Sequence, residues 1–148
     1  MHTLQGQKKT VAMSGCFDIL HIGHIHLIDG ARKHGDELVV LVESDEFIIT
    51  FKNRQPFHTQ QERAEMLAHI VGVDVVVLLP FMSGKEDYGA MWKKVRPQVI
   101  AHTEGDPYIA HKKEQAAEIG AKVIEVTPLI PHKSTTNALT HHPSKHSL

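Results

Sequence analysis

Apolar and polar positions divide the chain into five short apolar runs separated by longer stretches with helical spacing. The runs have strand length and fall at residues 10–13, 38–42, 73–79, 98–101 and 122–126. Few polar residues interrupt them, which is typical of strands covered by helices on both faces, as in a parallel sheet. The pattern predicts an α/β fold, a Rossmann-like arrangement of three layers around a five-stranded parallel sheet.

Between the runs, apolar residues recur with the period of amphipathic helices. The i, i+3, i+4, i+7 pattern follows the first run, at His24, Leu27, Ile28 and Ala31. Thr59 and Glu62 form a capping box, which begins a helix that we expect to reach about residue 70. Further helices are predicted over 87–95 and 109–119.

The segment 44–57 has no clean period. Its polar part, residues 52–55, follows the carboxyl end of the second predicted strand. We expect a mobile loop here, either a solvated charged loop or a basic loop that closes over a phosphorylated ligand and excludes water.

Length and composition limit the classes of protein to consider. The 148 residues suit a single domain, which we place at 10–140 between a flexible N-terminus (1–9) and a disordered tail (141–148). The 16 basic and 17 acidic residues give no charge signature of nucleic-acid or membrane binding. Without a signal peptide or a long apolar run, the chain is expected in the cytoplasm.

Histidine is abundant, with 13 residues, but its spacing does not favour a metal site. On a helix, His26 points about 200° away from His24, so the two cannot share a tetrahedral ion with His21. We therefore expect no metal ion bound by protein ligands.

The stretch 14–24 joins the first predicted strand to the first helix. In open parallel sheets ligands bind at such strand ends, where the helix directs unpaired N–H groups and its positive dipole end into a crevice. Gly15 allows close approach of a phosphate, and His21 and His24 lie on one side of the first turn. This geometry predicts a phosphate site.

The residues Gly15-Cys16-Phe17-Asp18-Ile19-Leu20-His21-Ile22-Gly23-His24 resemble the G-x-F-D-x-x-H-x-G-H signature of the cytidylyltransferase-like nucleotidylyltransferases. A Ser-Thr-Thr run at 134–136 resembles a second signature of that superfamily, and the similarity spans about residues 10–140. Within it, the chain is similar to the adenylyltransferase half of the bacterial heptose-phosphate enzyme and to glycerol-3-phosphate cytidylyltransferase.

The resemblance implies transfer of NMP from an NTP, ATP or CTP, to the phosphate of a small sugar or polyol phosphate, with release of pyrophosphate. It implies Mg²⁺ bound through the nucleotide phosphates, and a possible homodimer. The implied catalytic residues are His21, His24 and Lys52, and the implied acceptor-binding residues are Asp18 and Arg54. The implied nucleotide-binding residues are Gly15, Cys16, Phe17, Gly23, Arg63, Gly105, Asp106, Ser134, Thr135 and Thr136.

Arg63 shares a helix face with the apolar Leu67, where an unpaired guanidinium is costly. It needs an anionic partner, either Asp18 or Asp74 in a structural role or a nucleotide phosphate, and the resemblance favours the phosphate.

Two departures from the cytidylyltransferase pattern weaken CTP as the nucleotide. The chain lacks their arginine before Val73-Asp74, and residues 129–133 replace their R-T-E-G-I. Two other functions stay open: a non-catalytic nucleotide-binding module or sensor, and a redox or metal protein built on Cys16 and the histidines.

Overall fold

A computed structural model describes residues 6–130, so Ser134, Thr135 and Thr136 lie outside the described part of the chain. The sheet has five strands in the order β3-β2-β1-β4-β5, and every pairing is parallel. This confirms the predicted α/β, Rossmann-like architecture. The strands are β1 (Thr10–Gly15), β2 (Glu37–Val42), β3 (Val75–Leu78), β4 (Val99–Thr103) and β5 (Lys122–Thr127).

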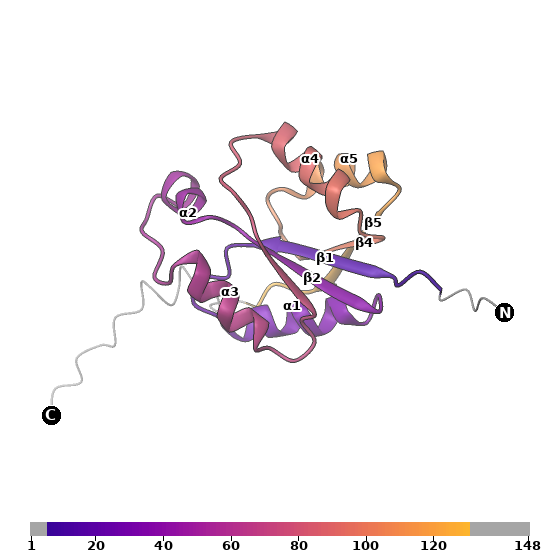
Figure 1. Ribbon diagram of the computed structural model, residues 1–148, viewed down its shortest axis with the longest axis horizontal. Helices are drawn as coiled ribbons and strands as arrows, with labels where there is room; N and C mark the ends of the chain where they lie inside the picture. Colours follow the sequence, from indigo (N-terminus) through magenta and orange to yellow (C-terminus); the bar gives the residue numbers. More distant parts are fainter. Residues whose placement is uncertain (1–5, 131–148) are drawn as a thin grey trace, which may run out of the picture.

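Helices cover both faces of the sheet (Figure 1). On one face lie α1 (Ile22–Arg32) and α3 (Gln60–Ala68), and on the other α4 (Lys85–Val95) and α5 (Ile109–Ile119). Successive strand residues point to opposite faces. Accordingly, Val11 and Met13 pack with the α1 side, whereas Ala12 packs with the α4 side together with the buried Trp92.

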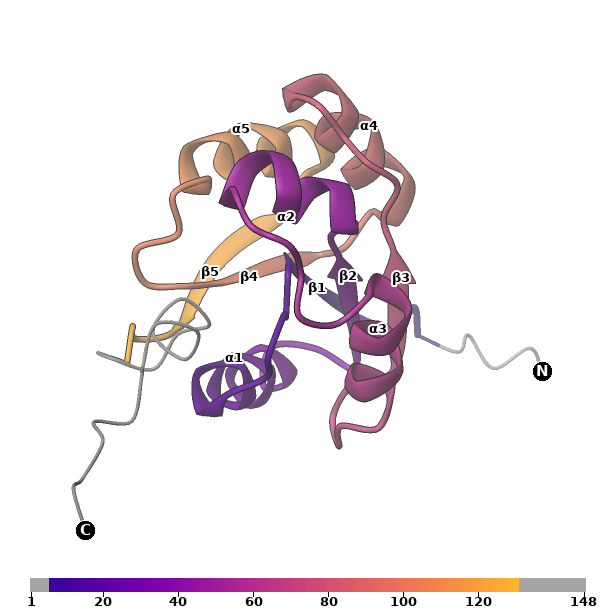
Figure 2. The same ribbon diagram turned by 90° about the vertical axis from the view of Figure 1, so that its left-hand side faces the viewer.

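The segment expected to be a mobile loop is mostly a helix, α2 (Asp45–Lys52), at the carboxyl end of the sheet (Figure 2). That prediction was wrong. The Ser44 hydroxyl caps the helix by accepting a hydrogen bond from the Phe47 N–H at 3.1 Å. Phe47 and Ile48 are buried, and they hold one face of the short helix against the domain.

A crevice opens where β1 and β4 separate. The two strands pair only through Val11 with Val99 and Ala12 with Ile100, whereas β1 pairs with β2 as far as Gly15. The strand order reverses between β1 and β4: the chain adds β2 and β3 on the β1 side and β5 on the β4 side. Doubly wound sheets bind their ligands at such a point.

Within residues 6–130 no helix combines the length and the apolar character needed to cross a membrane.

Gly30 marks a close contact between α1 and β5. A Cβ at this position would lie 2.5 Å from the Val126 carbonyl oxygen. Gly→Ala in a helix ordinarily stabilises by about 0.5–1 kcal/mol, but here we expect Gly30→Ala to destabilise by about 1–3 kcal/mol through overpacking. Denaturant unfolding measures the difference. In the control Gly89→Ala, in α4, the new Cβ meets nothing within 4 Å, so stabilisation is expected; equal effects at both sites would contradict the packing argument.

Candidate active site

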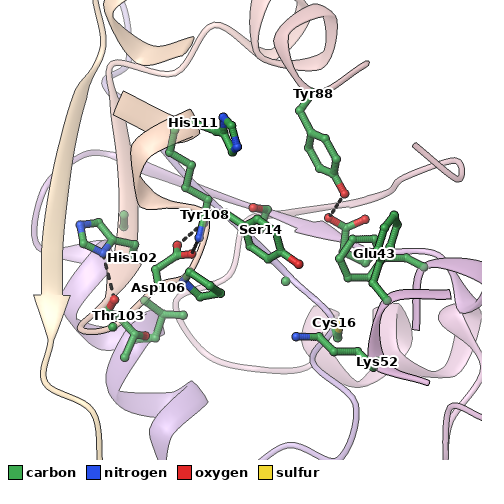
Figure 3. Close-up of a pocket in the computed structure, with 18 of the residues that line it drawn as sticks. Ser14, Cys16, Glu43, Lys52, Tyr88, His102, Thr103, Asp106, Tyr108 and His111 are labelled. Atoms are coloured by element: carbon green, nitrogen blue, oxygen red, sulfur yellow. Dashed lines mark hydrogen bonds and ion pairs between the residues drawn. The ribbon is translucent and has the colours of Figure 1, made fainter. Parts of the chain in front are cut away.

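A pocket of about 580 Å³ occupies the crevice at the carboxyl ends of the strands. One wall comes from the end of β2, from α2 and from the start of α4; the opposite wall comes from the β4–α5 connection (Figure 3). The end of β1 and the start of α1 also line it. The predicted residues that line the pocket are Gly15, Cys16, His21, Gly23, His24, Lys52, Gly105 and Asp106.

The two motif histidines cap α1 by exchanging hydrogen bonds with the backbone. His21 is the N-cap, and its Nδ1 accepts from the Gly23 N–H at 3.0 Å. His24 reaches back, and its Nδ1 accepts from the His21 N–H at 3.2 Å. The rings stack with centroids 3.8 Å apart. A capping box is usually made by a hydroxyl and a carboxylate, so this helix start binds its own N–H groups without adding negative charge.

These hydrogen bonds assign the protonation of both rings. Because each Nδ1 accepts, the ring proton of a neutral imidazole must lie on Nε2, which is then a donor. Burial lowers the pKa of His21, and burial together with the neighbouring His21 lowers the pKa of His24 to about 3. At neutral pH the pair is uncharged and offers two Nε2–H donors.

The loop before α1 contains backbone strain. Phe17 and Ile19 have φ values of 51° and 59°, in the left-handed region that β-branched and bulky residues rarely adopt. The Phe17 side chain is buried, and its ring lies against His24 with centroids 5.3 Å apart. Phe17 therefore supports His24 from behind. It is not among the described residues that line the pocket, where the resemblance implied a contact with the nucleotide.

Asp18, expected to contact the acceptor, holds this loop in place. Its fully buried carboxylate accepts from the Phe57 N–H at 2.9 Å and the His58 N–H at 3.0 Å, and it pairs with Arg54 at 2.6 Å. The arginine hydrogen bond and these backbone donors outweigh desolvation and lower the pKa of Asp18. Neither Asp18 nor Arg54 is among the described residues that line the pocket.

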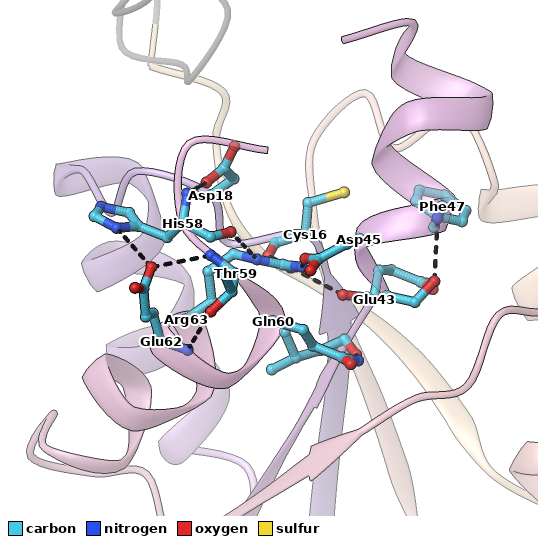
Figure 4. A network of polar contacts seen from close by, with 12 residues as sticks. Cys16, Asp18, Glu43, Asp45, Phe47, His58, Thr59, Gln60, Glu62 and Arg63 are labelled. Atoms are coloured by element: carbon cyan, nitrogen blue, oxygen red, sulfur yellow. Dashed lines mark hydrogen bonds and ion pairs between the residues drawn. The ribbon is translucent and has the colours of Figure 1, made fainter. Parts of the chain in front are cut away.

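Arg63 has a structural partner, and it is neither Asp18 nor Asp74. Its guanidinium is fully buried and pairs with Asp45 at 2.7 Å (Figure 4). It also donates to the backbone carbonyl oxygens of Cys16, Glu43 and His58 at 2.6, 2.9 and 3.1 Å. Since its donors bind the ends of β1 and β2, Arg63 fixes the pocket floor, and the expected nucleotide contact finds no support.

Cys16 lines the pocket as a protonated thiol. Burial raises its pKa to about 11, although Lys52 acts in the opposite direction. A thiolate is the reactive form of cysteine, so redox or nucleophilic chemistry at Cys16 is disfavoured. Among residues 6–130 no group of three or more His, Cys, Asp or Glu side chains is placed to hold a metal ion.

Gly105 and Asp106 form the tight turn expected after β4. Gly105 has a φ of 76°, and the Asp106 carboxylate accepts from the Tyr108 N–H at 2.8 Å and pairs with Lys112 at 2.5 Å. Both charged side chains are nearly buried, at 11% and 13% exposure.

Several pocket residues escaped the sequence analysis. They are Phe47 and Phe51 on α2, Met82 and Tyr88 around the start of α4, Glu43 after β2, and Tyr108, His111 and Lys112 at the start of α5. One signal was present: Ser44 precedes two acidic residues and an apolar spacing of Phe47, Ile48 and Phe51, which together indicate a capped helix.

The sequence matches a known protein family and is similar to characterised proteins. Residues 12–138 match the family described as cytidylyltransferase-like. The chain is 33% identical to the bifunctional protein HldE of Koribacter versatilis over 91% of its own length and 27% of that protein. It is 40% identical to the FAD synthase of Pyrococcus abyssi over 76% of its length and 75% of that enzyme. The chain therefore spans only about a quarter of HldE.

Solved structures agree with the fold. The lipopolysaccharide core biosynthesis protein from Thermoplasma volcanium superposes with a TM-score of 0.67 at 26% identity, over 84% of this chain and 98% of that one. The pantoate-beta-alanine ligase from Francisella tularensis gives the same TM-score at 15% identity, over 95% and 68%, a likeness in fold alone.

The histidine geometry predicts an abnormal titration. With the pKa of His24 at about 3 instead of the ordinary 6.5, the folded chain binds fewer protons than the unfolded chain below pH 6.5. This contribution to stability is complete above pH 6.5 and is lost as the pH falls towards 3. Ring ¹⁵N NMR should show His24 as the neutral Nε2–H form at pH 5. A His24 titration near pH 6.5 would contradict the assignment.

Proposed function

The chain belongs to the cytidylyltransferase-like family of nucleotidyltransferases, and from this premise we propose that it transfers NMP from an NTP to the phosphate of a small phosphorylated metabolite. A phosphate oxygen of the acceptor attacks the α-phosphorus in line, the new O–P bond forms, and the bond to the β-phosphate breaks to release pyrophosphate. The observation that carries the proposal is the pair of fixed Nε2–H donors at the start of α1, on a pocket wall.

The reaction needs positioning and charge stabilisation more than acid–base chemistry. A phosphate monoester is already a nucleophile, so the protein has to align two anionic substrates and stabilise the charge that develops on the α- and β-phosphates. Two neutral donors whose backbone hydrogen bonds are already formed can do this without reorganising, and α1 adds the positive end of its dipole.

Lys52 supplies the mobile positive charge in this proposal. It ends α2, lines the pocket beside Cys16, and stands on a helix that closes one wall. The nucleotide enters as its Mg²⁺ complex. Asp106 pairs with Lys112, the Glu104 carboxylate accepts from the Leu129 N–H, and the described carboxylates form no cluster of three. The ion would therefore rest on phosphate oxygens.

The two walls receive different substrates. The Gly105-Asp106 turn resembles the family turn beside the ribose and base, so we place the nucleotide on the β4–α5 wall. The wall formed by α2 and the start of α4 is left for the acceptor. Ser134, Thr135 and Thr136 keep their proposed role with the β- and γ-phosphates, as a prediction outside the described residues.

ATP is the nucleotide we favour. FAD is FMN joined to AMP, so similarity to an FAD synthase points to AMP transfer, and the missing arginine before Val73 already weakened CTP. The acceptor is a sugar phosphate, a polyol phosphate or FMN, whose phosphate is itself carried on a polyol chain. Dimerisation and a cytoplasmic location remain predictions.

Replacing His24 tests whether the imidazole pair contributes to catalysis. We expect His24→Ala to lower kcat by about 10²- to 10³-fold, the usual effect of deleting one preorganised donor to a developing charge. The chain should still fold, with the free energy of unfolding lowered by about 0.5–2 kcal/mol through loss of the cap. His26→Ala is the matched control, because His26 is exposed on the same helix and is not among the described pocket residues. Equal turnover in both variants would remove the histidines from the mechanism.

Pyrophosphate release is the direct test of the function. The screen crosses ATP and CTP, each with Mg²⁺, with sugar phosphates, glycerol 3-phosphate and FMN. Release that depends on one acceptor is expected. Nucleotide binding without release in any combination would favour a non-catalytic nucleotide sensor.

A further inference from the structure

Glu43 is a buried carboxylate whose hydrogen bonds are only half satisfied. It directly follows β2 and is 4% exposed. One carboxylate oxygen, Oε1, accepts from the Tyr88 hydroxyl at 2.8 Å. The other oxygen, Oε2, has no hydrogen-bond partner within residues 6–130. Buried polar atoms are almost always paired, so such an oxygen calls for an explanation.

The neighbouring charged side chains do not provide a partner for Oε2 of Glu43. Arg63 donates to the backbone carbonyl of Glu43 and forms its ion pair with Asp45, so its guanidinium forms no ion pair with the Glu43 carboxylate. Lys52 and Lys112 are close enough to lower the pKa of Glu43, yet burial dominates and raises it. The described side chains offer no metal cluster either.

Glu43 lies on the wall that we assign to the acceptor. Its carboxylate lies against the Tyr88 hydroxyl (Figure 3), and Phe47, Phe51 and Met82 line the pocket with it. Apolar and aromatic side chains surround the carboxylate on this wall, and Lys52, Ser83 and Lys85 also line it. A carboxylate repels phosphate groups, so it suits the part of the acceptor that carries no phosphate.

Resting on the proposed function, we propose that Glu43 determines acceptor specificity by accepting a hydrogen bond from a hydroxyl or N–H group of the phosphorylated acceptor. Tyr88 holds the carboxylate by donating to Oε1, which leaves Oε2 for the ligand. Phe47 and Phe51 contact the carbon skeleton. An acceptor without a donor group would leave Oε2 unpaired and would bind more weakly.

Matched acceptors test this on the unaltered chain. Calorimetry measures binding of three pairs in the presence of α,β-methylene-ATP, which cannot react: glycerol 3-phosphate against propyl phosphate, mannose 1-phosphate against cyclohexyl phosphate, and FMN against 3-methyl-FMN. Hydrogen bonds to charged groups predict that the donor-bearing member of one pair binds about 10- to 100-fold more tightly. The pair that is discriminated shows whether a polyol hydroxyl, a sugar hydroxyl or a heterocyclic N–H donates to Glu43.

Glu43→Gln then tests the residue. The amide keeps the size of the side chain and can still accept from Tyr88, but it carries no charge and its NH₂ group cannot accept from the ligand. The preference should therefore fall by about 5- to 10-fold, the difference between hydrogen bonds to charged and to neutral groups, while binding of the ATP analogue is unchanged. Glu46→Gln is the control, since Glu46 is exposed on α2 and is not among the described pocket residues.

Three results would overturn the inference: no pair is discriminated by the unaltered chain, Glu43→Gln keeps the preference, or Glu43→Gln weakens the ATP analogue equally. Pyrophosphate release without acceptor discrimination refutes the role of Glu43 alone. Discrimination without pyrophosphate release in any combination refutes the proposed function alone.

Discussion

The reciprocal hydrogen bonds between His21 and His24 are the constraint on which the site depends. Each ring accepts a hydrogen bond at Nδ1 from a backbone N–H at the start of α1, so each must present an Nε2–H donor. Burial keeps the rings neutral. A charged imidazolium would bind phosphate more strongly but could not accept at Nδ1 and cap the helix. The capping imidazoles therefore carry no positive charge, but their Nε2–H donors are fixed in direction. Fixed donors are what in-line transfer between two anions requires.

Two ion pairs, Asp18–Arg54 and Arg63–Asp45, each with one fully buried partner, hold the strained loop ahead of that cap. Asp18 binds the Phe57 and His58 backbone, and Arg63 binds the Cys16 and Glu43 carbonyls. These contacts join the ends of β1 and β2 to the start of α3, over spacings of 20 to 47 residues in the sequence. They oppose the cost of two left-handed residues, Phe17 and Ile19, and so belong to the architecture of the site even though their side chains do not line the pocket.

Local patterns predicted the sheet, the capping box at Thr59 and the histidine pair, because strand burial, caps and helix spacing are short-range properties of sequence. Other properties depend on contacts between distant segments. The sequence indicated that Arg63 needed an anion, but Asp45 became its partner only because the fold brings the start of α2 within reach of Arg63 on α3. The free oxygen of Glu43 likewise follows from its position between Tyr88 and the pocket. The α2 helix was missed for a local reason, since its short apolar face was overlooked beside the polar residues 52–55.

The most direct measurement is a crystal structure of the chain with α,β-methylene-ATP and Mg²⁺. We expect the α-phosphate at the start of α1, within hydrogen-bond distance of Nε2 of both His21 and His24, with the nucleoside along the β4–α5 wall. A triphosphate bound elsewhere, or rings that have turned to present Nδ1, would contradict this expectation.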